Sequence, residues 1–171
     1  MKSFRYISLL LSAATLSVYA EDKVSDAQIA AIVVSANQVD IDAGKFASEK
    51  STDAAVQAFA KTMVTDHTAV NKSAVDLVTK LKVSPQENDT SRALKEGGDQ
   101  NLAVLRTLDG KAFDKAYVDH EVAYHEQVIA ALDNVLIPNA QNAELKALLV
   151  KVRPAFVAHL GHAKHLQSSF H

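Results

Sequence analysis

The sequence contains no cysteine and no tryptophan, and only three prolines and five glycines among its 171 residues. Without cysteine the chain forms no disulfide and offers no thiolate, so any metal ion must be bound by histidine or carboxylate side chains. Glycine-rich phosphate loops, serine elbows and two-histidine zinc-protease motifs are missing too, so no catalytic signature indicates an enzyme. No stretch after residue 20 is apolar for long enough to span a bilayer.

The first twenty residues have the pattern of a signal peptide. Lys2 and Arg5 precede an apolar run over residues 6–18, and small residues lead up to Ala20. This run of 13 residues is shorter than the roughly twenty that a transmembrane helix needs. We therefore predict a signal peptide over residues 1–20, a mature domain over residues 21–171 and a periplasmic location, with outer-membrane association as an alternative.

The charge of the predicted mature chain is mildly acidic. The whole sequence has a formal net charge of -2, and removing Lys2 and Arg5 leaves 16 basic residues against 20 acidic ones, or -4. No basic patch stands out along the chain. We therefore expect no nucleic-acid partner.

Alanine is abundant and apolar residues recur at intervals of three and four, which is typical of amphipathic helices. We expect an all-α fold with four long helices, over residues 25–50, 53–82, 113–136 and 142–168. Residues 91–108 are expected to form a partly helical crossover between the second and third, because Gly97 and Gly98 weaken a helix there. Pro138 is expected to end the third helix, and Pro154 to kink the fourth.

Each predicted long helix carries one apolar seam, and one polar residue interrupts each seam: Asp40, His67, His125 and His159. A polar group buried without a partner costs about 1–3 kcal/mol, so these side chains must satisfy one another, water or a metal. Imidazole and carboxylate groups that project inward from facing helices form transition-metal sites in helical bundles. We therefore predict a metal site, for Fe, Cu, Zn, Ni or Mn, built from these four residues and from Glu121, which lies one turn before His125.

Several alternatives stay open at this point. Counted from the turns between the helices, Asp40 and His67 differ in depth by about four residues, or roughly 6 Å, so the set need not meet at one point. Buried polar residues can also fix helix register through hydrogen bonds alone. Asp66 and His162 are candidates for additional ligands or for partners of the ligands, and Tyr117 and Tyr124 are expected to pack beside the site. The remaining histidines, together with His162 in its simplest interpretation, are expected at the surface: His120, His162, His165 and His171.

Several stretches of the sequence resemble a bacterial family of domains of unknown function, DUF4142. They are residues 40–47 and 59–67, residues 108–117, His125, and Pro154 followed by His159 and Leu160. The resemblance implies an exported, ferritin-like four-helix bundle with a long crossover. The family pattern usually has glutamate at the position of Asp40, and no helix here places glutamate three residues before histidine as ferritin-like di-iron sites do.

Two functions follow from these observations. The first is a periplasmic metal-binding bundle that uses Asp40, His67, His125, His159 and Glu121. The alternative is a non-catalytic envelope protein that acts in stress tolerance or host interaction through a surface of the bundle, with a protein partner that the sequence does not identify.

Overall fold

The computed structural model describes residues 23–170, so the predicted signal peptide and His171 lie outside the described residues. Five long helices form this part of the chain: α1 (Asp26–Lys50), α2 (Ala54–Lys80), α3 (Asp89–Arg106), α4 (Gly110–Ala131) and α6 (Ala143–Gln167). Residues 23–170 contain no strand, which confirms the all-α prediction, although there are five long helices rather than four. None of the described helices is long and apolar enough to cross a membrane.

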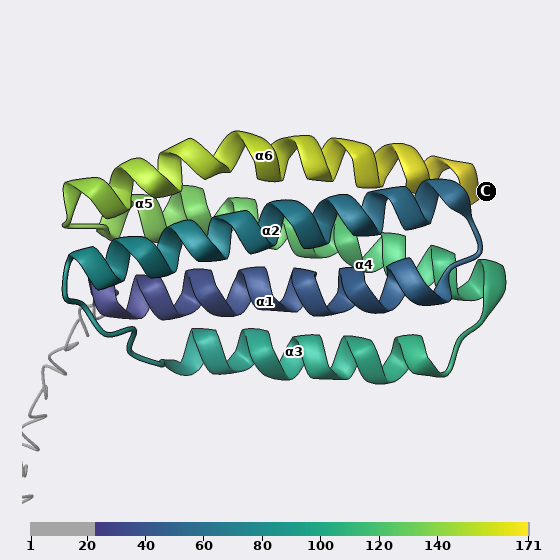
Figure 1. Ribbon diagram of the computed structural model, residues 1–171, viewed down its shortest axis with the longest axis horizontal. Coiled ribbons are helices and arrows are strands. Elements are labelled where there is room, and N and C mark those ends of the chain that lie inside the picture. Colours follow the sequence, from purple (N-terminus) through teal and green to yellow (C-terminus); the bar gives the residue numbers. More distant parts are fainter. Residues whose placement is uncertain (1–22, 171) are drawn as a thin grey trace, which may run out of the picture.

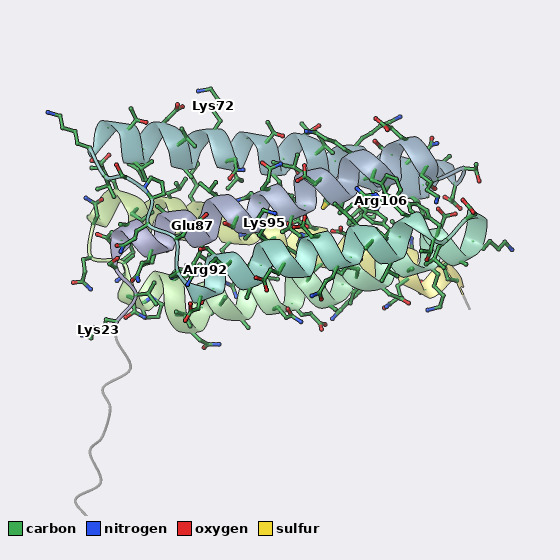
Figure 2. All side chains as sticks on the ribbon, turned by 90° about the horizontal axis from the view of Figure 1, so that it is seen from below. Lys23, Lys72, Glu87, Arg92, Lys95 and Arg106 are labelled. Atoms are coloured by element: carbon green, nitrogen blue, oxygen red, sulfur yellow. The ribbon has the colours of Figure 1, made fainter. Side chains whose placement is uncertain are left out.

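The five helices lie lengthwise beside one another, and consecutive long helices run in opposite directions (Figure 1). α1 packs against α2 on one side and against α3 on the other, while α4 packs mainly against α6. α3 therefore lies at the outside of the assembly. Its charged residues Arg92 and Lys95 lie at the surface of the molecule (Figure 2).

Polar side chains cap the starts of α1, α2 and α6. Ser25 and Gln28 form a reciprocal capping box at the start of α1, and Asp53 accepts hydrogen bonds from the first backbone amides of α2. Asn142 caps α6 in the same way. These side chains satisfy amides that the helices themselves leave unpaired.

The crossover is a complete helix, so the prediction of partial helicity for residues 91–108 was wrong. Asn88 and Ser91 form a capping box at its start, and Lys95 forms an ion pair with Asp99 one turn later. The only residues of α3 that are buried are Ser91, Gly98 and Leu105, which are spaced seven apart. Gly98 packs on Val39 of α1, where an added Cβ would lie 2.8 Å from a methyl carbon. Tertiary packing therefore outweighs the low helix propensity of the glycine pair.

The third predicted helix starts earlier and ends later than expected. α4 begins at Gly110, and after Ala131 the chain continues through a π-helical turn, Leu132–Leu136, into a short α5, Ile137–Asn139. The helical segment then ends at Asn139, one residue after Pro138. In the π turn the amide of Ile137 donates to the carbonyl of Leu132, and this wider turn relieves the clash that a proline ring makes with the preceding α-helical turn.

The core consists of two apolar clusters with a polar layer between them. One cluster includes Ile29, Leu132 and Leu149, and the other includes Phe59, Phe113 and Leu166. On α2, for example, Met63 belongs to one cluster and Ala74 to the other, and the buried His67 lies between them. Every long helix except α3 contributes a buried polar side chain to this layer. Pro154 lies within α6, about one and a half turns before the buried His159.

Candidate metal centre

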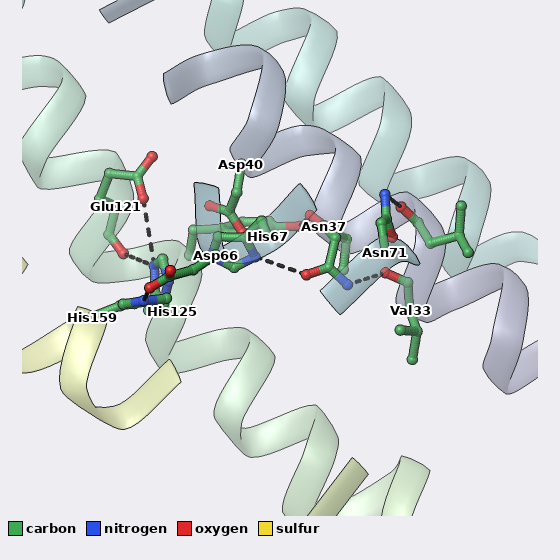
Figure 3. A network of polar contacts seen from close by, with 12 residues as sticks. Val33, Asn37, Asp40, Asp66, His67, Asn71, Glu121, His125 and His159 are labelled. Atoms are coloured by element: carbon green, nitrogen blue, oxygen red, sulfur yellow. Dashed lines mark hydrogen bonds and ion pairs between the residues drawn. The ribbon is translucent and has the colours of Figure 1, made fainter. Parts of the chain in front are cut away.

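The five side chains predicted to form a site come together in the polar layer, and all are buried (Figure 3). Asp40 comes from α1, His67 from α2, Glu121 and His125 from α4, and His159 from α6. The predicted mismatch in depth does not separate them, since Oδ2 of Asp40 lies 3.5 Å from Nδ1 of His67. Helix offset and side-chain reach absorb the difference.

Three of these residues are histidines whose rings are mutual neighbours. The centroid of the His67 ring lies 5.6 Å from that of His125 and 5.2 Å from that of His159, and the last two lie 5.5 Å apart. One ring nitrogen of each lies within 4.8 Å of the corresponding atom of the other two. The rings of Phe156 and His67 form a T-shaped pair with centroids 5.1 Å apart, so the group has an apolar wall.

The tautomer of His67 is fixed by Asn37. The side-chain amide nitrogen of Asn37 donates to the backbone carbonyl of Val33 at 2.7 Å, so its oxygen must be the atom that lies 2.8 Å from Nδ1 of His67. An amide oxygen only accepts hydrogen bonds. Nδ1 of His67 therefore carries the hydrogen, and Nε2 carries the lone pair.

The same argument applies to the other two rings. Nδ1 of His125 lies 2.9 Å from the backbone carbonyl oxygen of Glu121, and Nε2 of His159 lies 2.9 Å from a carboxylate oxygen of Asp66. Both oxygens accept, so both nitrogens donate. Asp66, predicted as an additional ligand or as a partner of one, is thus a hydrogen-bond acceptor for His159. The lone pairs are on Nε2 of His125 and Nδ1 of His159.

The three remaining nitrogens, Nε2 of His67, Nε2 of His125 and Nδ1 of His159, are buried and have no hydrogen-bond partner within residues 23–170. Burial lowers the pKa of His67 from 6.5 to about 2, with a further contribution from His125 and His159. Burial likewise lowers the pKa of His125 to about 4. The rings of His67 and His125 are therefore neutral near pH 7, which is the form that binds metal ions.

The two carboxyl groups lie on the N–H side of the rings. An oxygen of Glu121 lies 3.5 Å from Nδ1 of His125, as an oxygen of Asp40 does from Nδ1 of His67. Burial raises the pKa of Glu121 from 4.5 to about 8, and burial together with the charge of Glu121 raises the pKa of Asp40 well above its usual value. Oxygens of both carboxyls and one nitrogen of His125 also lie within 4.8 Å of one another.

The sequence analysis missed Asn37, which lies one turn before Asp40 on the same face of α1 and is fully buried. Its position three residues before Asp40, on the same face of the helix, is the signal that could have identified it. Of the predicted surface histidines, His162 and His165 are exposed, although the ring of His162 packs on Phe59. His120 is half-buried and stacks on Tyr124, so its surface assignment was wrong.

The comparisons with known proteins identify a family and no function. Searches of curated proteins and of solved structures give no significant match. Residues 12–166 match a domain of unknown function, DUF4142. The match covers most of the chain, so the protein belongs to the DUF4142 family.

Proposed function

We propose that this protein binds one divalent transition metal ion through Nε2 of His67, Nε2 of His125 and Nδ1 of His159. The observation that supports this most directly is the orientation of the three rings. Each ring donates its N–H to a fixed oxygen, and each has a buried lone pair that meets no donor among residues 23–170. A cation shared by the three lone pairs satisfies all of them at once.

The partners of the three rings resemble the supports of known metal sites. A histidine that binds a metal generally donates its other ring N–H to a carboxylate, a backbone carbonyl or a water, which holds the ring in place. Asp66 and the backbone carbonyl of Glu121 are acceptors of the first two kinds, and the side-chain carbonyl of Asn37 is a third acceptor. Three separate helices therefore present rings that are already oriented, which lowers the entropic cost of binding.

Asp40 and Glu121 supply the opposite charge. Three neutral imidazoles around a divalent ion leave two positive charges in the core, and a buried charge without compensation is costly. The two carboxyls lie beside the ligand rings. When ionised, they balance that charge without occupying a coordination position of the metal ion. This proposal gives the two predicted carboxylate ligands an electrostatic role.

The donor set favours zinc, copper, nickel or ferrous iron over magnesium or calcium. Imidazole nitrogen suits the first group, whereas the second prefers oxygen ligands. Three protein ligands also leave one coordination position for water or another small ligand.

We also propose export to the periplasm, supported by the basic, apolar and small-residue pattern of residues 1–20. Within the fold, α1, α2, α4 and α6 would act as a ferritin-like four-helix unit. The support for this grouping is that these helices contribute the buried polar layer and that α3 does not.

The test is metal content after equilibration of the untagged, stripped protein with each metal in turn and removal of the excess. We expect about one ion per chain for the wild type and none for a His67→Ala, His125→Ala, His159→Ala variant. The matched control removes three other histidines, His120→Ala, His162→Ala, His165→Ala, and should keep the full content. Equal binding by both triple variants, or none by the wild type, would contradict the proposal.

A further inference from the structure

Two hollows lie between α3 and α4 and form one groove. Their volumes are about 290 and 140 Å³, and they share four lining residues: Thr90, Leu94, Tyr124 and Gln127. The larger hollow also reaches His120 and the glycine pair of α3, and the smaller one runs on to Ile32, Val128 and Leu136. Together they have the size of a small-molecule site at the lower end of the usual range.

The glycine pair explains why the groove is open. Gly98 has no room for a side chain, because a Cβ there would lie 2.8 Å from a methyl carbon of Val39, so α3 lies close to α1. Gly97 is exposed and lines the larger hollow, and a Cβ there would meet nothing within 4 Å. α3 thereby lies tightly on α1 while a cleft is left toward α4. Each central glycine destabilises a helix by roughly 1 kcal/mol. The close packing on α1 and the cleft toward α4 give a reason for the presence of both glycines.

The lining of the groove is uncharged. Neither hollow has a lysine, arginine, aspartate or glutamate among its lining residues. Six of the nine residues that line the smaller hollow are aliphatic: Ile32, Ala36, Leu94, Val128, Ala131 and Leu136. A charged ligand would lose its hydration here without gaining a partner.

One end of the groove has an aromatic wall and a free polar atom. The rings of His120 and Tyr124 stack with their centroids 5.6 Å apart and an interplanar angle of 14°. Nδ1 of His120 is buried and has no hydrogen-bond partner in the described chain. The hydroxyl of Tyr124 is already used, since it donates to the carbonyl of Ala36 at 3.0 Å. His120 is therefore a buried polar group available to a ligand, in addition to the side chains of Thr90 and Gln127 that line both hollows.

From this lining we infer that the groove binds an uncharged aromatic molecule with one hydroxyl group and a short aliphatic chain. Its ring packs against His120 and Tyr124, its hydroxyl pairs with Nδ1 of His120, and its aliphatic chain enters the apolar hollow toward Leu136. This site is separate from the metal centre. Tyr124 forms a wall of the groove and also packs on the ring of His125, with centroids 6.3 Å apart.

The experiment uses N-phenylnaphthylamine, an uncharged dye that fluoresces in apolar surroundings, with para-propylphenol as competitor. We expect saturable binding of the dye to the full chain and its displacement by the phenol. Gly97→Leu places a side chain in the empty space and should weaken dye binding by about tenfold or more. The matched control is Gly161→Leu on α6, where an added Cβ also meets nothing within 4 Å. This control should bind as the wild type does.

Two further variants keep the outcome decisive. Ala93→Phe fills the same hollow from an exposed position and should repeat the loss seen with Gly97→Leu, with folding checked by circular dichroism. His120→Phe keeps an aromatic ring without a nitrogen, so it should weaken para-propylphenol by about fivefold, the value of one hydrogen bond, and leave propylbenzene unchanged. The inference is overturned if the wild type shows no saturable binding, or if filling the hollow changes nothing relative to Gly161→Leu.

Discussion

The side-chain oxygen of Asn37 lies 2.8 Å from Nδ1 of His67 across the interface between α1 and α2. The orientation of the amide is set by its other end, which donates to the carbonyl of Val33 within α1. A backbone group of one helix thereby determines which nitrogen of a histidine on another helix carries the hydrogen. The proposed metal site depends on these two hydrogen bonds of Asn37 for the orientation of one of its three ligands.

Replacing Asn37 should therefore weaken metal binding without abolishing it. Asn37→Leu keeps the side-chain size but removes the acceptor. The hydrogen bond that fixes the orientation and the tautomer of the His67 ring is then lost. Loss of such a supporting partner typically costs 10–100-fold in metal affinity. We expect a loss in this range, with about one ion still bound at saturation, in a titration against a chelator of known affinity.

The control for this prediction is Asn71→Leu. Asn71 lies one turn after His67 on α2, is half-buried, and its amide reaches the carbonyl of Val34 at 3.5 Å rather than a histidine. Its replacement should leave the affinity within a few-fold of the wild type. An equal loss in both variants would mean that packing, and not the tautomer of His67, explains the effect.

Much of the site could be predicted because the seams are regular. A single polar residue in each apolar seam identified Asp40, His67, His125 and His159, and the helical spacing added Glu121; all five are buried in one layer. The sequence could not reveal which ring nitrogens are free. That depends on Asn37, on a backbone carbonyl and on Asp66, whose positions follow from how the helices are offset.

The fold was predicted less well where tertiary packing opposes local propensity. Gly97 and Gly98 indicate a weak helix, but the contact of Gly98 with Val39 holds α3 in place along its length. Pro138 indicates a helix end at residue 136, but a π turn accommodates it and the helical segment continues to Asn139. Neither the long-range contact nor the widened turn has a signature in single-residue preferences.

Substituting alanine at the adjacent glycines Gly97 and Gly98 should change the free energy of unfolding in opposite directions. Gly97→Ala adds a methyl group in empty space and removes a flexible residue from a helix, so it should raise the free energy of unfolding by roughly 0.5–1 kcal/mol. Gly98→Ala would place its Cβ 2.8 Å from Val39, so it should lower that energy by about 1–3 kcal/mol through overpacking. Urea titration of the two variants measures both values. A gain at both positions would show that α3 does not press on α1 as the structure has it.

A second stability prediction concerns the end of α2. Lys82 has a positive φ of 54°, its amide donates to the carbonyl of Thr79, and the amide of Val83 donates to that of Val78. This is a Schellman motif, in which the left-handed position favours glycine. Lys82→Gly should therefore stabilise the protein by up to about 1 kcal/mol in thermal unfolding, whereas Lys61→Gly, at an exposed position in the interior of α2, should destabilise it by a similar amount.

The buried ionisable groups predict how the stability of the metal-free protein depends on pH. His67 and His125 have folded-state pKa values of about 2 and 4, below the 6.5 of an unfolded histidine. At these two positions the unfolded chain binds more protons below pH 6.5, so the contribution of the two histidines to the free energy of unfolding should fall as the solution is acidified from pH 6.5 to about 4. The limiting slope is about 1.4 kcal/mol per pH unit for each histidine.

The two carboxyls act in the opposite direction. Glu121 keeps its proton in the folded state up to about pH 8, whereas an unfolded glutamate loses it near 4.5, and Asp40 is shifted in the same sense. Between pH 4.5 and 6.5 the carboxyls and histidines oppose each other. From pH 6.5 to 8 only the carboxyls act, so the free energy of unfolding should fall as the pH rises, by at most about 1.4 kcal/mol per unit for each.

Removing the buried carboxyls should abolish this alkaline decline. We expect the Asp40→Asn, Glu121→Gln variant to unfold in urea with the same free energy at pH 6.5 and 8, while the wild type loses stability over that interval. Asp42→Asn, Glu126→Gln is the matched control, since it makes the same changes on the same two helices at less buried positions. If the buried pair ionises at an ordinary pH instead, the wild type and both variants will show the same pH dependence over this range.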